Sequence, residues 1–461
     1  MTDPVLEVAD TRTQNESSAN CASLVEQRKP AKQPKVLIVN LHSKRNAGDA
    51  AALEMAVALI RKVFPHAQIS LSINDPGSCS SDEDAEVLGS FFTIVDSSGN
   101  ERQVQRTLLK MPIVLVESLC GALWFHLLGR PYRSIFPFPR DLLRAYMGAD
   151  LAISAPGNVF LTKARMGLPF LASLFRAAYA VLLGKPLYIM PQSIGPFRQR
   201  WERWLTGWLL SKAALVFTRD EVSFRLLQEM GFTEPQHRLV PDVVFAFPAA
   251  PPEVASQVLR RYGVDLEQDR PLLGWTAINP FVKHIDKESW KNYEEILSLV
   301  VPRFVREYGG KAIFFPQVTG PWEIEDDRKA ARRIIARMER DSERVVFIEE
   351  PLPPALLKSA CGLMDVFLAT RMHSGVFALS AGVPTLAVGY LSKTRGIMET
   401  LGLQKWVLEI ESLEEEVLWA TLQALWEERH AVRRHLIERI PTLVDQIDHL
   451  GETIAEDFYG R

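Results

Sequence analysis

Residues 369–375 read ATRMHSG and stand between an apolar run and a helical pattern. The apolar run, residues 365–369, predicts a buried strand, and residues 374–381 predict a short helix closed by a glycine and a proline. A second apolar run, residues 385–389, predicts the next strand. The arginine and histidine are therefore expected on a strand-to-helix turn, at the sheet edge where open α/β folds bind ligands.

The residue types on this turn suit an anionic ligand. Arg371 offers a planar fork for carboxylate or phosphate, and His373 can give or take a proton near neutral pH. Ser374 opens the helix, whose N–H groups favour an anion, and Lys393 follows the next strand toward the same pocket. A solvated turn is the alternative, but the apolar strands on both sides favour a site.

Length and composition describe a globular, multidomain protein. The chain has 461 residues, 47% of them hydrophobic, which suggests two or three domains. Its net charge of −3 argues against nucleic acid as a partner. The four cysteines are scattered without a CxxC pair, which predicts a reducing, cytoplasmic location, and no Cys or His cluster predicts a metal site.

Three regions bear on targeting and membranes. Residues 1–33 are polar, lack an apolar core and are expected to be a disordered tail. Residues 111–128 and 168–183 are too short or too charged to span a bilayer, so buried or amphipathic helices are expected. The helical spacing of four apolar residues favours packing in the core, and peripheral membrane contact is the alternative. These residues are Trp201, Trp204, Leu205 and Trp208.

The first half of the chain alternates strands and helices. Strands are expected at residues 35–40, 67–73, 91–95, 151–154, 187–190 and 214–218. Each is followed by a polar loop, so the loops should gather at one sheet edge. The loop residues that we expect to bind substrate are Asn46, Gly48, Asp49, Gly157, Asn158, Gln192 and Ser193. Asp49 is also the expected N-cap of the first helix, and Arg219 is the second arginine expected in the site.

The second half repeats this alternation after a proline-rich boundary at residues 247–252. The predicted organisation is a tail (1–33), an N-terminal Rossmann-like domain (34–248), and a C-terminal Rossmann-like domain with terminal helices (253–461). Two α/β units, each with ligand-facing loops, predict a cleft between the domains.

The motifs, taken in order, resemble those of the polysaccharide pyruvyl transferases. The matching pieces run from residue 35 onward: Asn46-x-Gly48-Asp49, Gly184-Lys185-Pro186, residues 191–197 (PQSIGPF), Arg219-Asp220-x-x-Ser223 with Gly231-Phe232, Pro241-Asp242, Arg371-Met372-His373-Ser374 with Gly382-Val383-Pro384, and Tyr390-x-x-Lys393-x-x-Gly396. Each piece alone is weak, and their order and spacing together are specific.

The resemblance implies two Rossmann-like halves in a GT-B-like arrangement. It implies transfer of a pyruvyl group from phosphoenolpyruvate to a sugar hydroxyl pair, giving a ketal, in surface polysaccharide biosynthesis, without cofactor or metal. Arg219 and Arg371 would hold the carboxylate and phosphate of phosphoenolpyruvate, His373 would act as acid or base, and Lys393 would support the phosphate. The acceptor would be a saccharide, free or lipid-linked.

One turn departs from the family pattern. Family members commonly have a Gly-Gly-Gly-type turn where this chain reads Ser154-Ala155-Pro156-Gly157-Asn158, and Pro156 removes an N–H there. The departure bears on the acceptor and on the chemistry itself. Two alternatives to the pyruvyl transferase stay open. One is a nucleotide-sugar-dependent glycosyltransferase on a GT-B-like scaffold, and the other is a non-catalytic sugar-binding family member.

Overall fold

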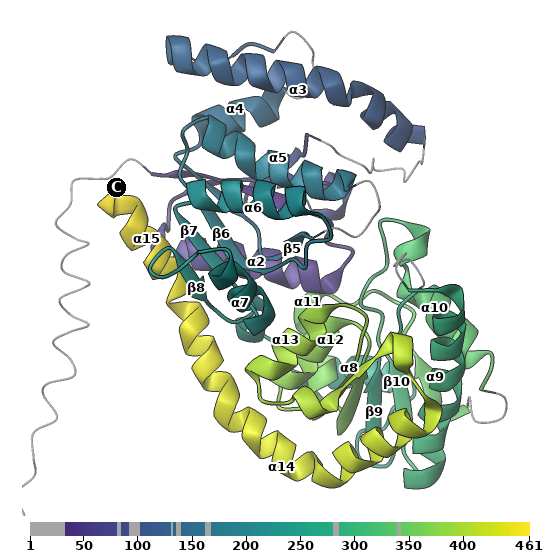
Figure 1. Cartoon of the computed structure of the whole chain (residues 1–461). Helices are drawn as coiled ribbons and strands as arrows, with labels where there is room; N and C mark the ends of the chain where they lie inside the picture. The colour runs from purple at the N-terminus through teal and green to yellow at the C-terminus, as the bar shows by residue number, and fades with distance from the viewer. Residues whose placement is uncertain are drawn as a thin grey trace, which may run out of the picture.

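The structure is a computed structural model that describes residues 33–80, 84–91, 102–130, 132–134, 140–161, 167–279, 285–338 and 343–461, with the backbone alone at 102–111 and Ser392. The predicted tail lies outside these ranges except for its last residue. The described chain forms two lobes, which Figure 1 shows one above the other. No helix of the described residues is long and apolar enough to cross a bilayer.

The N-terminal lobe is built on an eight-stranded parallel sheet. Its order is β3-β2-β1-β4-β6-β7-β8, and β5 pairs with β6. The strands are β1 (Lys35–Leu41), β2 (Gln68–Ile73), β3 (Glu86–Gly89), β4 (Leu151–Ser154), β5 (Gly157–Phe160), β6 (Leu187–Ile194), β7 (Leu215–Thr218) and β8 (His237–Leu239).

The C-terminal lobe is built on a six-stranded parallel sheet of order β11-β10-β9-β12-β13-β14. The strands are β9 (Leu272–Trp275), β10 (Lys311–Phe314), β11 (Val345–Phe347), β12 (Val366–Ala369), β13 (Thr385–Gly389) and β14 (Val407–Glu409). In both sheets the first three strands are added toward one edge and the later strands toward the other, starting beside the first strand. This is the doubly wound strand order of Rossmann folds. The predicted fold class, two Rossmann-like domains, is confirmed.

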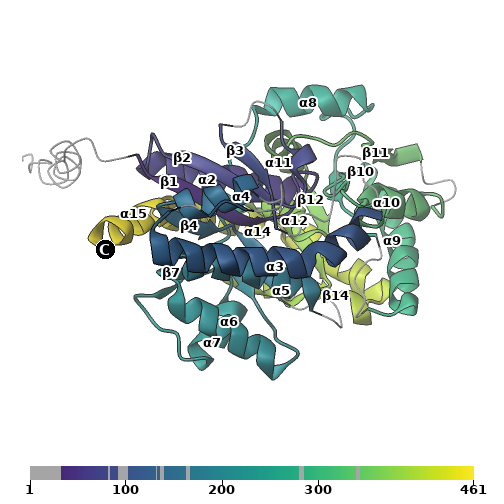
Figure 2. The same cartoon turned by 90° about the horizontal axis from the view of Figure 1, so that it is seen from above.

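Helices cover both sheets, as Figure 1 and the view from above in Figure 2 show. The N-terminal lobe has α2 (Ala47–Val63), α3 (Arg102–Leu128), α4 (Arg140–Gly148), α5 (Leu168–Leu182), α6 (Arg200–Lys212) and α7 (Glu221–Glu229). The C-terminal part has α8 (Pro252–Arg261), α9 (Lys287–Tyr308), α10 (Asp327–Ile335), α11 (Pro354–Gly362), α12 (Met372–Ser380), α13 (Ser392–Thr400), α14 (Glu415–Asp448) and α15 (Leu450–Gly460). Short 3₁₀ turns include η2 (Val243–Ala246) and η3 (Glu323–Glu325).

Two strand predictions need correction. The strand expected at 187–190 continues through Pro191 to Ile194, because the ladder with β7 is irregular between Ile189 and Gln192 and so tolerates a residue without an N–H. The third strand was expected at residues 91–95, but the structure forms β3 earlier, at Glu86–Gly89. Residues 92–95 lie outside the described part of the chain.

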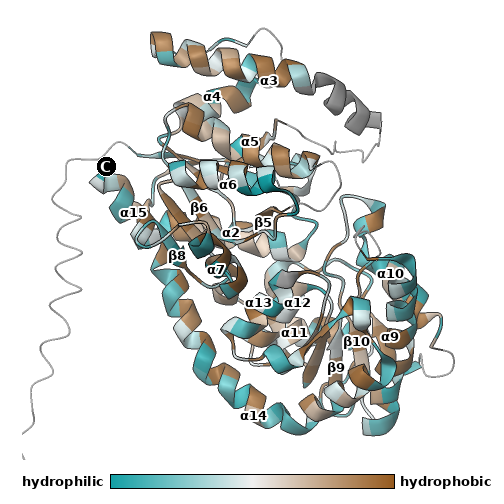
Figure 3. Ribbon diagram, viewed as in Figure 1, coloured by the Kyte–Doolittle hydropathy of each residue, from teal (hydrophilic) through white to brown (hydrophobic). Residues whose placement is uncertain are grey.

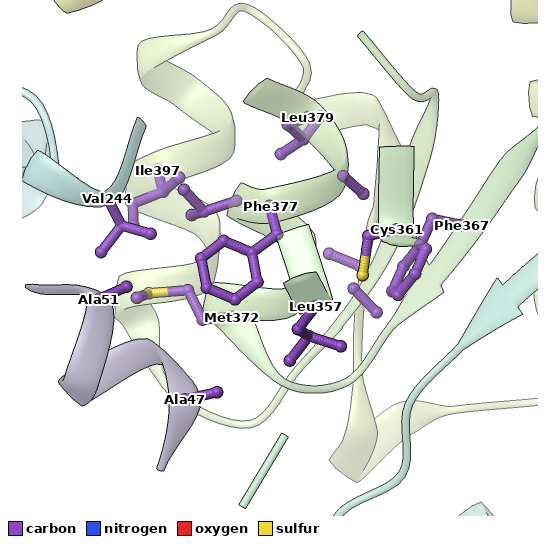
Figure 4. Close-up of a cluster of buried hydrophobic side chains, with 14 of the residues drawn as sticks. Ala47, Ala51, Val244, Leu357, Cys361, Phe367, Met372, Phe377, Leu379 and Ile397 are labelled. Carbon is purple, nitrogen blue, oxygen red and sulfur yellow. The ribbon is translucent and has the colours of Figure 1, made fainter. Parts of the chain in front are cut away.

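A single hydrophobic cluster joins the two lobes. Figure 4 shows Ala47 and Ala51 of α2 beside Met372 and Phe377 of α12, with Val244 of η2 between the lobes. All five side chains are at most 8% exposed. Because close packing resists displacement, this contact fixes the loop before α2 relative to the turn before α12.

The C-terminal helices connect the lobes a second time. In Figure 1, α14 runs in yellow along the C-terminal lobe and back toward the N-terminal one. α15 then packs on α2, where Gly451 approaches the backbone of Leu59, and Asp457 accepts a hydrogen bond of 2.8 Å from the hydroxyl of Tyr188. The range 253–461, expected as one domain, therefore contributes its last helix to the other lobe.

Candidate active site

A cavity of about 410 Å³ lies between the lobes, a volume typical of small-molecule sites. Its walls come from the carboxyl ends of β1, β4, β7, β10, β12 and β13, so both sheets present their ligand-binding edges to it. Eight of the predicted site residues line it: Asn46, Asp49, Gly157, Asn158, Arg219, Arg371, His373 and Lys393.

Four residues predicted to bind substrate lie behind the cavity wall instead. Gln192 and Ser193 are buried inside β6, where Gln192 donates to Ser154 and to the carbonyl of Ala155. The predicted loop placed them at the surface, and the longer strand buries them. Ser374 is also buried and donates to Oε1 of Gln317 at 2.6 Å.

Gly48, the fourth, supports the site by close contact. It lies in the first turn of α2, and a Cβ built on it would stand 2.0 Å from Nδ1 of His373. Only a residue without a side chain fits between α2 and the imidazole. Its role is therefore to let the histidine approach the helix.

The N-terminus of α2 is occupied rather than open to a ligand. Asn46, not the predicted Asp49, is the N-cap, and its Oδ1 accepts from the N–H groups of Gly48 and Asp49 at 3.0 and 3.4 Å. The N–H of Ala47 donates at 3.0 Å to the carbonyl of Gln317 in the other lobe. These bonds leave the side chain of Asp49 to face the cavity.

Arg219 follows β7 and is held by two buried partners. Its Nη1 bonds Oδ2 of Asp242 at 2.6 Å, and its Nε donates to Oγ of Ser193 at 2.9 Å. Ser193 in turn donates to Asp220, which caps α7. Burial alone would raise the pKa of Asp242, but Arg219 and His373 hold that pKa below its usual value. The carboxylate is therefore charged and fixes the arginine at the cavity wall.

Arg371, the N-cap residue of α12, is held in a similar way. Its Nε and Nη2 form a bidentate pair with the buried carboxylate of Asp327, with Nε–Oδ1 at 2.9 Å. Burial raises the pKa of Asp327 to about 6 although Arg371 lowers it, so this carboxylate is still largely ionised at neutral pH. Tyr390 also bonds Arg371 and lines the cavity. Each predicted arginine thus has its own buried aspartate.

His373 lies beside the pair formed by Arg219 and Asp242. Its Nε2 is 3.9 Å from Oδ2 of Asp242 and makes no hydrogen bond with any described residue. Burial lowers the pKa of His373 to about 4, although Asp242 acts in the opposite direction. The imidazole is therefore neutral at pH 7, so its ring can accept a proton from a bound group.

The start of α12 is the part of the wall best suited to an anion. Among the described residues, no side chain caps its first turn, in contrast to α2 and α7. Lys393 stands 6.0 Å from the ring centroid of Tyr390, at the same cavity. No group of three His, Cys, Asp or Glu side chains in the described ranges could hold a metal ion.

Sequence reasoning missed several residues of this site. Asp242 stood in a quoted motif but received no role, and Asp327 and Gln317 gave no local signal because their partners are 44 and 57 positions away. Arg176 of α5 lines the cavity and drew attention only as a charge within an apolar stretch. The turn at 154–158, noted for its departure from the family pattern, does contribute Pro156, Gly157 and Asn158 to the wall.

Comparison with known proteins places this geometry in a family context. A sequence model of the family "Polysaccharide pyruvyl transferase" matches residues 46–392. The amylovoran biosynthesis protein AmsJ of Erwinia amylovora is 24% identical over 432 residues, covering 92% of this chain and 98% of AmsJ.

Similar solved structures include a putative UDP-N-acetylglucosamine 2-epimerase from Listeria monocytogenes, with a TM-score of 0.57 and 14% identity over 94% of this chain and 98% of that one. The S. aureus MnaA–UDP structure gives a TM-score of 0.54 and 12% identity over 88% and 91%. These structural likenesses support the GT-B-like arrangement of the lobes.

Proposed function

Because the chain belongs to the polysaccharide pyruvyl transferase family, we propose that it takes the pyruvyl group from phosphoenolpyruvate and joins it to two hydroxyls of a sugar as a ketal. The family and the AmsJ relative support a role in pyruvyl transfer during polysaccharide synthesis. We further propose that the reaction takes place in the cytoplasm.

One observation carries the choice of donor: two arginines, a lysine and a neutral imidazole line one cavity between the lobes. An enol phosphate has a carboxylate and a phosphate only a few bonds apart, so it needs forked cations on both sides and one group that moves a proton. Arg219 and Arg371 supply the forks, and His373 supplies the proton-transfer group.

The reaction assigns each group a task. Neutral His373 takes the proton of the first sugar hydroxyl, whose oxygen bonds to C2 of the enol, and returns a proton to the methylene carbon. The bond from C2 to the phosphate oxygen then breaks, and the second hydroxyl oxygen bonds to C2 while its proton leaves with phosphate. Arg371, Lys393 and the start of α12 stabilise the departing phosphate. The buried aspartates keep both arginines in place.

The direct test is incubation of the protein with phosphoenolpyruvate and candidate saccharides while phosphate release is measured. Thermal unfolding gives an independent test, because a ligand present at 100 times its Kd stabilises the folded state by about 2.7 kcal/mol. Phosphoenolpyruvate should raise the melting temperature. Stabilisation by UDP-sugars instead would favour the nucleotide-sugar-dependent glycosyltransferase, and stabilisation by a neutral sugar alone would favour a sugar-binding protein without catalysis.

We also propose that the acceptor is lipid-linked and that α3 contacts the membrane. Glu117 and Ser118 of α3 point inward, and Glu117 bonds Ser134. The opposite face is exposed and apolar, with Ile113, Val116, Leu119, Leu123, Trp124, Leu127 and Leu128 at 43 to 72% exposure. In Figure 3, much of the coloured part of α3, the outermost helix of the lobe, has the hydrophobic colour.

Charge near this face favours an anionic lipid surface over a protein partner. Arg130 and Arg133 are exposed just beyond the helix, and cations beside an apolar helix face are typical of interfacial binding. The tryptophans of α6 are also exposed, Trp204 at 68%, because Thr206, Leu209 and Leu210 form its buried face instead. The core packing predicted for those tryptophans is wrong.

Sedimentation with phosphatidylglycerol vesicles tests this contact. The wild type should bind them, and Leu123→Glu with Leu127→Glu should release it. Leu299→Glu, at an exposed leucine of α9, is the matched control and should have no effect. Equal binding by both variants, or a dimer in solution that the α3 variant dissociates, would refute the membrane contact.

A further inference from the structure

One wall of the cavity comes from a single face of α5. Pro169, Ala172, Ser173 and Arg176 all line it, and their spacing of three and four residues places them on one side of the helix. Arg176 is only 3% exposed. A long cationic side chain is thus buried at a ligand cavity without a role in the proposed chemistry.

The guanidinium of Arg176 has no counter-charge within the described part of the chain. It forms no ion pair or hydrogen bond there, and its Nε is fully buried without a partner. Arg219 and Arg371, the other arginines of the cavity, each have a buried aspartate. An unpaired buried cation is unfavourable, so such a group is retained where a ligand supplies the anion.

Different ionisable groups act on Arg176 and on His373. Burial lowers the pKa of Arg176 to about 10, and the one ionisable neighbour in the described chain that acts on this pKa is Tyr146. The charges that act on His373 are those of Asp242, Arg219, Asp49 and Lys393. In the fold, Arg176 lies on α5 of the N-terminal lobe, whereas His373 lies in the first turn of α12 in the C-terminal lobe.

The remaining space also points to the acceptor. A three-carbon enol phosphate fills only part of about 410 Å³, and Arg371 and His373, which we assign to the donor, lie at the start of α12. The α5 face shares its end of the cavity with the turn that carries Gly157 and Asn158, since β5 packs against α5. A second substrate would therefore extend along α5.

We propose that Arg176 binds an anionic group of the saccharide acceptor, a carboxylate or a phosphate. That the bound molecule is the acceptor rests on the proposed function, but anion binding at Arg176 is measurable without turnover. A uronic acid would supply the carboxylate, and the diphosphate that joins a glycan to a carrier lipid would supply the phosphate. Guanidinium binds either group with two parallel hydrogen bonds.

Binding is measured by titration calorimetry with saturating phosphoenolpyruvate, so that the donor cations are occupied. The probes are glucuronate, glucose and an alkyl diphosphate, which separate the two sources of anion from a neutral sugar. We expect one anionic probe to bind the wild type, and Arg176→Gln to weaken it about 10- to 100-fold, the range for a hydrogen bond to a charged group. Arg176→Lys, which keeps the charge, should recover part of that affinity, and glucose should be unaffected.

Thermal unfolding without ligand separates a binding role from a structural one. Loss of an unpaired buried cation should leave the melting temperature of Arg176→Gln equal to or above that of the wild type. Arg260→Gln, at an exposed arginine of α8, is the control for loss of charge alone. A lower melting temperature for Arg176→Gln than for this control would overturn the inference.

Three binding results would also overturn it: equal anion affinity in wild type and Arg176→Gln, binding of neither anion by the wild type, or an Arg176→Gln effect on phosphoenolpyruvate affinity. Failure of the proposed function would look different. The wild type would then neither bind phosphoenolpyruvate nor release phosphate, whereas anion affinity measured without the donor would still depend on Arg176.

Discussion

Substitution of Gly48 by alanine should disable the site although it alters no reacting group. Gly48 lies in the first turn of α2 with ordinary helical backbone, where alanine by itself favours the helix by about 0.5–1 kcal/mol. The added methyl carbon, however, would lie 2.0 Å from Nδ1, 2.2 Å from Cγ and 2.4 Å from Cβ of His373. Local propensity and tertiary contact therefore oppose each other at this position.

The contact with Cβ sets the size of the effect. Rotation of the imidazole cannot relieve it, because Cβ of His373 is fixed to the α12 backbone. Ordinary contact begins at 3.4 Å, so α2 and α12 must separate by about 1 Å at this point. Overpacking of this kind costs about 1–3 kcal/mol, and a misplacement of about 1 Å in a catalytic group can cost about 100-fold in rate.

The assay is phosphate release from phosphoenolpyruvate with a saccharide acceptor whose two hydroxyls are free, together with thermal unfolding. Gly148→Ala is the matched control, since Gly148 ends α4 and a Cβ there would meet nothing within 4 Å. We expect Gly48→Ala to stay folded with kcat about 100-fold lower, and the control to match the wild type. Gly48→Ala with wild-type kcat would refute the reasoning.

Four further predictions concern the same cluster. The pKa of His373 is about 4 in the folded protein and 6.5 as its ordinary value, so the unfolded state binds more protons between these values, and the free energy of unfolding decreases as the pH is lowered, by on the order of 3 kcal/mol from pH 7 to below 4. Denaturant unfolding across this range should show that His373→Gln lacks this loss, and parallel curves for the two proteins would contradict it. The same variant, and His373→Ala, should lower kcat by about 10²–10⁴ with the fold intact, as steady-state rates will show. Arg371→Lys should weaken phosphoenolpyruvate binding in calorimetry because a point charge cannot replace a fork, and unchanged affinity would remove Arg371 from donor binding. Asp242→Asn leaves Arg219 buried and unpaired and should destabilise the fold by about 3–5 kcal/mol in urea unfolding, whereas a neutral effect would show that the pair is dispensable.

Local signals in the sequence predicted most of the framework. Apolar runs that end in Gly, Pro or polar loops marked the strands, and the alternation with helices predicted parallel sheets with ligands at their carboxyl ends. That rule alone brought Arg219, Arg371 and His373 to one edge before any contact was known. Local signals failed at Pro191, because an irregular ladder tolerates proline there and β6 continues beyond it. They also failed at Trp204, because the apolar stripe of Leu209 and Leu210, rather than that of the tryptophans, packs into the core.

The sequence by itself determined which strands carry the charged residues and which edge they share, because strand direction and side-chain type are local properties of the chain. Tertiary structure alone decided how those charges are balanced: Asp242 beside Arg219, Asp327 beside Arg371, and no carboxylate among the described residues beside Arg176. Pairing between residues tens of positions apart depends on how the two sheets and their helices pack together. Burial, which lowers the pKa of His373, is likewise a property of the packed lobes rather than of any short stretch of chain.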